Sequence, residues 1–513
     1  MKIVIPMSGI GSRFASAGYA EIKPLIKVDG KTIIEHVIDM FPKDSEFIFI
    51  CNEEHLKLIP ELSAVLSINP SSQIVSVKPH KKGPVYAVSQ HLNLIDDQEE
   101  IIVNYCDFCC DWNFDDFISF VRKNNLDGCI PSYRGFHPHT LWSNYYAYLK
   151  LNELLVEDIQ EKTPFTNKPR DEYASSGTYY FKSGALLKDS IKKCINQNLH
   201  INNEYYISLA YKPLLDDGKK IMPYPLKHFM QWGTPQDLEE YKYHSKSFKI
   251  LKQFQHPSET MPGYNIIPMA GLGSRFSSQG YIDPKPLIKV RNEYMFLHAL
   301  KMLPPHENTL LISRNLDLNQ NILNNLSEKK VNHIKLDQVT DGQATTCMQA
   351  VNKLDHGTPF TIGACDNGLL YNYERFQEAY KSADIIVWSI RDYPGALRRP
   401  EMYGWLDVDV NNVIKKVSVK QSIDSNTHLP IVTGAFTFKE KNQYIEAYQK
   451  LLERDGKVNG EFYVDELIND CISLGMKCIS FEVDSYLCWG TPEDLKTFLY
   501  WDECFQSWPK SSE

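Results

Sequence analysis

Short apolar runs alternate with stretches of helical spacing along the chain. Lys2–Met7 is an apolar run typical of a buried strand, and Thr32–Phe41 spaces its apolar residues three and four positions apart, as an amphipathic helix does. Further strands are predicted at Glu46–Cys51, Ile74–Lys78 and Glu100–Tyr105, and further helices at Pro84–Leu94 and Phe114–Lys123. The alternation predicts an α/β fold with a mostly parallel sheet flanked by helices, which binds its ligands at the carboxyl ends of the strands.

The second half of the chain repeats the first. Residues 5–28 and 267–290 are identical at 17 of 24 positions. The strand series recurs at Asn265–Met269, Thr309–Ser313, His333–Leu336 and Phe360–Gly363. A repeat of this length predicts two tandem domains, 1–252 and 264–513, and not a solenoid of short units. The residues between them, 253–263, contain Pro, Ser and Gly and are predicted to form a linker.

Composition and charge exclude several classes of protein. The 513 residues are 43% hydrophobic and 23% charged, which is typical of a globular protein. A net charge of -9 argues against a nucleic-acid partner or an anionic membrane surface. There is no signal-peptide pattern and no apolar run of the ~18 residues that a membrane span needs. The 12 scattered cysteines favour reduced thiols, so we expect a cytoplasmic protein without membrane insertion.

A glycine-rich loop follows the first strand of each copy. It reads Gly9-Ile10-Gly11-Ser12-Arg13 in the first copy and Gly271-Leu272-Gly273-Ser274-Arg275 in the second. Two glycines let backbone N–H groups approach a phosphate closely. Lys23 and Lys285, each followed by Pro-Leu, add a second cation ten residues after the arginine. A forked guanidinium and a point charge together suit a triphosphate.

Two common nucleotide-binding motifs are excluded at this loop. Phe14 stands where a dinucleotide fingerprint needs its third glycine, and the Gly-Lys-Ser/Thr of a P-loop is missing. Instead, Gly-x-Gly-x-Arg-Phe, Gly-Tyr and Lys-Pro-Leu-Ile-x-Val resemble the opening signature of the nucleotide-diphospho-sugar transferase superfamily. Within it the chain most resembles the sugar-phosphate nucleotidylyltransferases (NDP-sugar pyrophosphorylases). The variant with Phe14 and Gly18-Tyr19 is similar to a subgroup often associated with bacterial capsule synthesis.

The resemblance implies a fold and an activity. The fold would be two Rossmann-like (GT-A-like) domains. The activity would be Mg²⁺-dependent transfer of a nucleotide from an NTP to a phosphorylated sugar or small phospho-alcohol, with release of pyrophosphate. A phosphomonoester is largely dianionic at pH 7, so such a reaction needs no catalytic histidine. We therefore expect His36 and His298, which recur in the two copies, to be structural.

The resemblance also implies roles for individual residues. The cations expected at the reacting phosphates are Arg13, Lys23, Lys162, Arg275, Lys285 and Lys420. The nucleotide would contact Gly9, Gly11, Ser12, Gly83, Gly271, Gly273, Ser274 and Gly342. The acceptor would contact Glu161, Glu204 and Glu461, and stack on Trp232 and Trp489. The second copy departs from this pattern because Val419 stands in the place of Glu161.

Asp107 and Asp366 match the family's magnesium carboxylate. The family commonly has a second Asp late in the domain, where Gln231 and Cys488 stand here. A carboxamide oxygen can ligate Mg²⁺, whereas a thiol is a poor ligand for that hard ion. The first copy is therefore predicted to have the better magnesium site, which substrate phosphates would complete.

Two other functions fit the same sequence. A related glycosyltransferase would consume an activated sugar, but such enzymes usually hold their metal with Asp-x-Asp, and neither Asp107-Phe-Cys109 nor Asp366-Asn-Gly368 has that pattern. Alternatively, one or both copies bind a nucleotide without turnover, which the missing second carboxylate favours.

Overall fold

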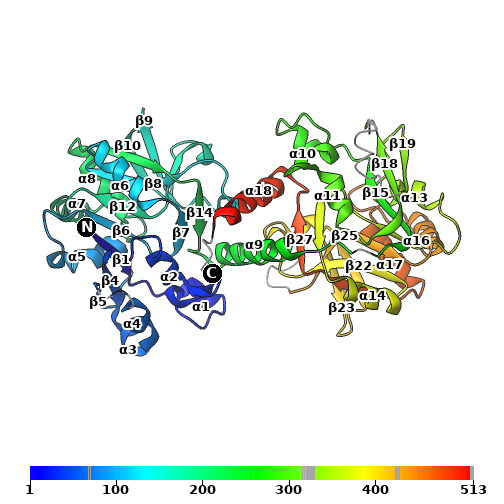
Figure 1. Ribbon diagram of the computed structural model, residues 1–513, viewed down its shortest axis with the longest axis horizontal. Coiled ribbons are helices and arrows are strands. Elements are labelled where there is room, and N and C mark those ends of the chain that lie inside the picture. The colour runs from blue at the N-terminus through cyan, green and yellow to red at the C-terminus, as the bar shows by residue number, and fades with distance from the viewer. Residues whose placement is uncertain are drawn as a thin grey trace. The chain divides into compact units, whose positions relative to one another are not determined.

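The computed structural model describes residues 1–508, apart from 68, 70, 258, 315, 317, 319–329 and 422–427. The chain forms two compact units (Figure 1). Unit 1 comprises Met1–Lys242 and the end of the chain from Cys504, and unit 2 comprises Tyr243–Glu503. Residue 258 of the predicted linker and residues 509–513 of the predicted second domain lie outside the described residues.

Unit 1 is built on a ten-stranded mixed sheet in the order β10-β9-β11-β8-β12-β6-β1-β4-β5, with β13 beside β8. Its strands are β1 (Lys2–Met7), β4 (Glu46–Asn52), β5 (Gln73–Val77), β6 (Ile101–Asn104), β8 (Gly128–Tyr133), β9 (Ala147–Asn152), β10 (Leu155–Glu161), β11 (Tyr173–Ser175), β12 (Thr178–Phe181) and β13 (Ile221–Pro225). The strands β5, β4, β1 and β6 are parallel, and β12 pairs antiparallel with β6 and β8. Two short ribbons, β2 (Lys27–Val28) with β3 (Lys31–Thr32) and β7 (Phe108–Asp111) with β14 (His228–Gln231), lie outside this sheet.

The helices of unit 1 follow the predicted alternation. They are α1 (Ser12–Ser16), α2 (Ile33–Ile38), α3 (Glu53–Leu58), α4 (Pro60–Leu66), α5 (Pro84–Ser89), α6 (Phe114–Lys123), α7 (Gly184–Asn196), α8 (Ile207–Asp216) and α9 (Pro235–Gln253), which continues into unit 2. Local sequence sets their ends. Thr32 and Glu35 form a reciprocal capping box at the start of α2. Thr234 and Asp237 form a similar pair at the start of α9, where the Thr234 hydroxyl accepts from the Asp237 N–H and donates to its carboxylate.

Unit 2 repeats this architecture. Its sheet has the order β19-β18-β15-β20-β25-β22-β26, with β23 paired to β25 and β24 paired to β23. The strands are β15 (Met261–Met269), β18 (His306–Arg314), β19 (Lys330–Leu336), β20 (Phe360–Ile362), β22 (Ile385–Ile390), β23 (Gly404–Val408), β24 (Ile414–Val419), β25 (Ile431–Phe438) and β26 (Cys478–Glu482), and the ribbons are β16 (Lys289–Val290) with β17 (Glu293–Tyr294) and β21 (Asn367–Leu370) with β27 (Ser485–Cys488). The helices are α10 (Ser274–Ser277), α11 (Met295–Lys301), α13 (Gln343–Val351), α14 (Tyr373–Ser382), α15 (Pro394–Arg398), α16 (Lys441–Glu453), α17 (Val464–Ser473) and α18 (Pro492–Ser507). The predicted α/β class, with mostly parallel central strands, is confirmed in both units.

The unit boundaries differ from the predicted ones. Strand β15 begins at Met261, so the last residues of the predicted linker belong to a strand. The end of the chain packs in unit 1: Cys504 Sγ lies 3.7 Å from Met230 Sδ, and the Phe505 ring contacts Tyr241. Long-range apolar packing of this kind has no signature in the local sequence pattern.

No helix among the described residues combines the length and the apolar character that crossing a membrane requires.

Candidate active site

The glycine-rich loop leaves β1 and enters α1 through a left-handed residue. Gly11 has φ 74° and directly precedes α1, and Gly273 has φ 63° before α10. L-residues with side chains rarely adopt this conformation, which explains a glycine at this position in both units. A Cβ atom built on Gly9 or Gly11 would meet no atom within 4 Å. The loop therefore presents its backbone to open space, as a phosphate-binding loop must.

A phenylalanine anchors the loop at the position where a dinucleotide fingerprint has its third glycine. Phe14 is 2% exposed and packs edge-on against Tyr19, with ring centroids 5.2 Å apart. Phe276 and Tyr281 repeat this contact at 5.0 Å in unit 2. Since the phenylalanine side chain is buried under the loop, its role is packing, and Arg13 beside it stays exposed.

The second cation of the motif lies on the predicted metal carboxylate. Lys23 Nζ donates to Asp107 Oδ2 at 2.5 Å, and Lys285 makes the same ion pair with Asp366. Burial opposes the charge on Lys285, but the carboxylate of Asp366 outweighs it and raises the pKa of the lysine. Asp107 follows β6, which pairs parallel with β1. Asp107 and the Lys23 ammonium group that contacts it therefore lie at the carboxyl edge of the sheet.

Gln231 faces Asp107 across a glycine. A Cβ atom on Gly233 would lie 3.0 Å from Gln231 Nε2 and 3.3 Å from Asp107 Oδ2. In unit 2 the corresponding Gly490 would approach Asp366 Oδ2 at 3.3 Å and Cys488 Sγ at 3.5 Å. In both units, therefore, the predicted metal carboxylate and the residue in the place of the family's second Asp lie beside the same glycine.

A large cleft in unit 1 brings several predicted residues together. Its volume is about 770 Å³. The predicted residues that line it are Arg13, Asp107, Glu161, Lys162 and Gln231. Lys23 does not line the cleft, but it donates a hydrogen bond to Asp107, which does. The predicted residues that are not part of its wall are Gly9, Gly11, Ser12, Gly83, Glu204 and Trp232.

The lysine predicted to hold the acceptor phosphate has the same unusual backbone conformation in both units. Lys162 follows β10 with φ 60°, and Lys420 follows β24 with φ 50°. Left-handed backbone at a non-glycine residue is uncommon and concentrates at functional sites. The backbone N–H of Lys162 donates to the Tyr146 carbonyl at 2.8 Å, and that of Lys420 donates to the Tyr403 carbonyl at 3.1 Å. The left-handed backbone and its hydrogen bond to a tyrosine carbonyl therefore recur at both lysines.

Tyr206, which was not among the predicted site residues, links Lys162 to Glu204. Lys162 Nζ donates to the Tyr206 hydroxyl at 2.5 Å and lies 4.5 Å from its ring centroid, while Tyr206 donates to Glu204. Burial and then Glu204 raise the pKa of Tyr206, and the positive charge of Arg13 opposes this rise. In unit 2, Lys420 lies 4.9 Å from the ring centroid of Tyr463. The signal in the sequence was the recurrence of a tyrosine two residues after Glu204 and Glu461.

The comparison with known families gives the identification. Residues 2–245 match the sequence model of the family described as nucleotidyl transferase. We refer to unit 1 as the nucleotidyltransferase domain because this match spans nearly all of it. No curated protein matches the chain.

Solved structures similar to the chain include two that cover nearly half of it. One is a nucleoside-diphosphate-sugar pyrophosphorylase from Vibrio cholerae RC9, with 21% identity, a TM-score of 0.40, and coverage of 47% of this chain and 99% of that chain. The other is an inositol-1-phosphate CTP transferase from T. maritima, with 17% identity, a TM-score of 0.38, and coverage of 47% and 97%.

The tryptophans predicted to stack on the acceptor are wrongly assigned. Trp232 in the nucleotidyltransferase domain and Trp489 in unit 2 are both 0% exposed. Trp232 packs edge-on against His36 with ring centroids 5.2 Å apart, and Trp489 packs against His298 at 5.0 Å. An indole enclosed in the core offers no face to a ligand. The two histidines are structural, as predicted: His36 Nε2 lies 2.7 Å from the Val28 carbonyl oxygen.

Gly83 and Gly342, which were predicted to contact the nucleotide, pack closely against the backbone of Tyr205 and Phe462. Gly83 has φ 82°, and a Cβ atom there would lie 2.6 Å from the Tyr205 carbonyl oxygen. Gly342 has φ 127° and the same close approach, 2.4 Å, to the Phe462 carbonyl oxygen. These glycines are therefore required by the packing of the segments that carry Tyr206 and Tyr463.

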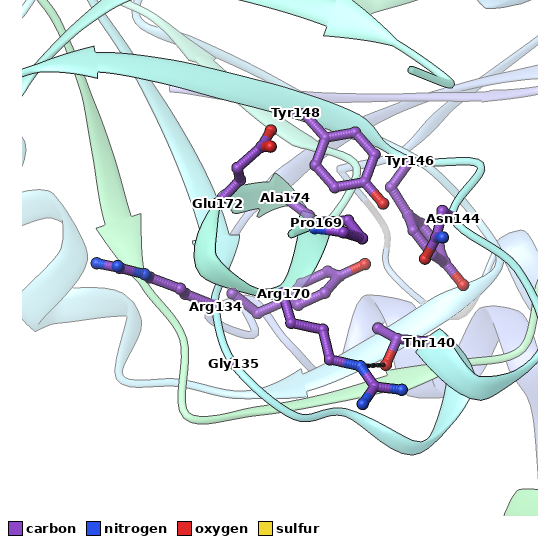
Figure 2. Close-up of a pocket in the computed structure, with 11 residues that line it drawn as sticks. Arg134, Gly135, Thr140, Asn144, Tyr146, Tyr148, Pro169, Arg170, Glu172 and Ala174 are labelled. Atoms are coloured by element: carbon purple, nitrogen blue, oxygen red, sulfur yellow. Dashed lines mark hydrogen bonds between the residues drawn. The ribbon is translucent and has the colours of Figure 1, made fainter. Parts of the chain in front are cut away.

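A smaller pocket of the nucleotidyltransferase domain lies beside the cleft and shares Tyr146 with it (Figure 2). Figure 2 shows Arg170 donating from Nε to Thr140 Oγ1, a distance of 3.1 Å. Glu172 accepts from the backbone N–H groups of Phe165 and Thr166 at 2.9 and 2.7 Å. None of the predicted site residues lines this pocket, so the candidate chemistry belongs to the larger cleft.

Glu161 is a buried titratable group in the wall of the cleft. It accepts a hydrogen bond from Ser208 Oγ at 2.6 Å, and burial raises its pKa from 4.5 to about 7. Because the folded protein holds this proton to a higher pH than the unfolded chain does, its contribution to stability is present below pH 4.5 and is lost as the pH rises to about 7.

Glu161→Gln should remove this loss of folding stability with rising pH. We expect the unfolding midpoint of the variant, relative to the natural chain, to be higher at pH 8 than at pH 5. Denaturation curves at both pH values measure it, with exposed Glu157→Gln on the same strand as the control. Equal pH dependence in the Glu161 variant and the natural chain would contradict the assignment.

Proposed function

We propose that the nucleotidyltransferase domain joins an NTP to a phosphorylated sugar or small phospho-alcohol and releases pyrophosphate. The observation that carries this proposal is one cleft lined by Arg13, from the glycine-rich loop, and by Lys162, from the end of β10. Two separate cations in one cleft suit two phosphorylated substrates that must be brought together against their mutual repulsion.

The chemistry requires positioning and charge neutralisation. An oxygen of the acceptor phosphomonoester attacks the α-phosphorus of the NTP, a new P–O bond forms, and the bond from the α-phosphorus to the bridging oxygen breaks. The leaving group is pyrophosphate. Since the attacking phosphate is already largely dianionic at pH 7, no side chain has to remove a proton. Arg13 would neutralise charge on the NTP, and Lys162 would hold the acceptor phosphate in line.

Asp107 and Gln231 fit a magnesium ion. Asp107 Oδ2 and the Gln231 carboxamide both lie beside Gly233. Asp107 would offer a carboxylate oxygen, and Gln231 would offer its Oε1 once the carboxamide turns that atom, in place of the Nε2 that now lies nearest Gly233, toward the ion. When bound, the ion would supply positive charge to the phosphates of the NTP. Within the described residues there is no cluster of three or more His, Cys, Asp or Glu side chains that could hold a metal, so substrate oxygens would complete the coordination.

The direct test is turnover. The chain is incubated with each NTP and a panel of sugar 1-phosphates and small phospho-alcohols, with and without Mg²⁺, and pyrophosphate is measured. We expect release with at least one pair and its loss on chelation of the metal. No release from any pair would contradict the proposal.

Arg13→Ala should lower kcat/KM by about 10²-fold, because the variant loses a charge-assisted contact to the NTP phosphates. Arg275→Ala, the corresponding change in unit 2, is the matched control and should leave the rate within about 2-fold. A full rate for Arg13→Ala would mean that the loop does not bind the triphosphate.

Unit 2 has a second candidate function, nucleotide binding without turnover. The observation that favours it is the pair Asp366 and Cys488 at Gly490, where a thiol replaces an oxygen ligand. The shared sheet order and the shared opening motif support our proposal that the units arose by tandem duplication.

We further propose that the product is a cytoplasmic precursor of a bacterial surface polysaccharide such as a capsule. The resemblance of the opening motif supports the polysaccharide. The 12 cysteines, all free thiols, support the compartment.

A further inference from the structure

The carboxyl group beside the acceptor lysine comes from different elements in the two units. In unit 1 it belongs to Glu161, the last residue of β10, and Ser208 of α8 donates to it at 2.6 Å. The corresponding residues of unit 2 are Val419, the last residue of β24, and Asp465 in the first turn of α17. In unit 2, therefore, the acidic side chain is on helix α17 and not at the end of strand β24.

A third position changes together with these two. Ala147 pairs with Glu161 across β9 and β10, and Gly404 pairs with Val419 across β23 and β24. A Cβ atom built on Gly404 would lie 2.5 Å from Asp465 Oδ2, closer than real Cβ atoms approach. An alanine like that of unit 1 would therefore displace the Asp465 carboxylate. Glycine at 404 makes room for it, so the three differences are physically coupled.

The surroundings of the two carboxyl groups are alike. Lys162 and Lys420 follow the two strands with left-handed backbone, and each lies over the ring of a tyrosine, Tyr206 or Tyr463. Burial raises the pKa of Asp465 to about 6 and the positive charge of Lys420 opposes this, just as burial raises that of Glu161 and Lys162 opposes it. Burying a carboxyl group costs free energy. Retaining one at this place from a different element indicates a ligand that needs it.

We propose that Asp465 is the acceptor-binding carboxyl group of unit 2, where it accepts a hydrogen bond from a hydroxyl group of a phosphorylated sugar or polyol whose phosphate lies on Lys420. The inference rests on the function proposed for unit 1, because it takes Glu161 and Lys162 as the acceptor site. Unit 2 then has an acceptor site formed by Asp465 and Lys420, although Cys488 alters its metal site. Unit 2 therefore binds a hydroxyl-bearing phosphate ester whether or not it catalyses transfer.

Calorimetric binding to the full chain tests this assignment. Lys162→Ala is introduced first to disable the acceptor site of unit 1. The probes are glucose 1-phosphate, inositol 1-phosphate and glycerol 3-phosphate, with inorganic phosphate as the reference that carries no carbon-bound hydroxyl group. Thermal unfolding of each variant verifies that it is folded.

We expect at least one ester to bind this chain more tightly than inorganic phosphate. Adding Asp465→Asn should weaken the binding of that ester by about 10-fold or more and change the binding of inorganic phosphate by less than about 2-fold. The triple change Gly404→Ala, Val419→Glu and Asp465→Ser, which rebuilds the arrangement of unit 1, should restore the affinity to within about 3-fold.

Two results would overturn the inference: no ester binding better than inorganic phosphate, or Asp465→Asn binding every ester as its parent does. Both results are measured as ligand binding to unit 2, and neither requires turnover. The function of unit 1 fails in a different experiment, pyrophosphate release by the chain with Lys162 intact, so the two failures are distinguishable.

Discussion

Asp107→Asn should lower kcat/KM for pyrophosphate release by about 10²–10³-fold. Asparagine keeps the size of the side chain but removes the negative charge. The ion pair with Lys23 is lost, and so is the carboxylate that faces Gln231 across Gly233. The reacting phosphates then lose a fixed ligand for their cation. Steady-state rates at saturating Mg²⁺, with both substrates varied, measure the effect.

The matched control for this variant is Asp366→Asn in unit 2, which breaks the equivalent ion pair with Lys285. If unit 1 carries the turnover, this control should stay within about 2-fold of the natural chain. The reverse pattern, with Asp366→Asn inactive and Asp107→Asn near full rate, would place catalysis in unit 2 and refute the proposed function of unit 1.

Gly83→Ala should destabilise unit 1 by about 3 kcal/mol or more and raise KM for the acceptor. At φ 82° a side chain is strained, and the added Cβ atom would lie 2.6 and 2.7 Å from the carbonyl oxygen and nitrogen of Tyr205. Neither of these backbone atoms can rotate away. Movement of this segment would also shift Glu204 and Tyr206, its neighbours in the sequence. Urea denaturation and acceptor titrations measure the two effects.

Gly18→Ala separates backbone strain from steric contact. Gly18 has φ 87°, nearly the same as Gly83, but a Cβ atom there would meet nothing within 4 Å. Its cost should be that of the left-handed backbone alone, about 1–2 kcal/mol, with the acceptor KM unchanged. Equal losses in the two variants would show that close packing at Gly83 contributes nothing.

The sequence predicted those parts of the site that depend on local geometry. A glycine loop must leave β1 before α1, and the left-handed conformation of Gly11 is a property of that one residue. Apolar periodicity predicted β1 and α6 with the same bounds that the structure has. The buried tryptophans were misassigned because sequence position beside the acceptor region does not tell which way a side chain points.

By itself, the sequence determined the α/β class, its repetition and the loop, because periodicity and glycine spacing act over a few residues and appear twice in one chain. Only the tertiary structure decided that Lys23 pairs with Asp107, that Tyr206 contacts Lys162, and that Gly404 leaves room for Asp465. These contacts join residues from different strands and helices, and the distance between such side chains is set by how the elements pack.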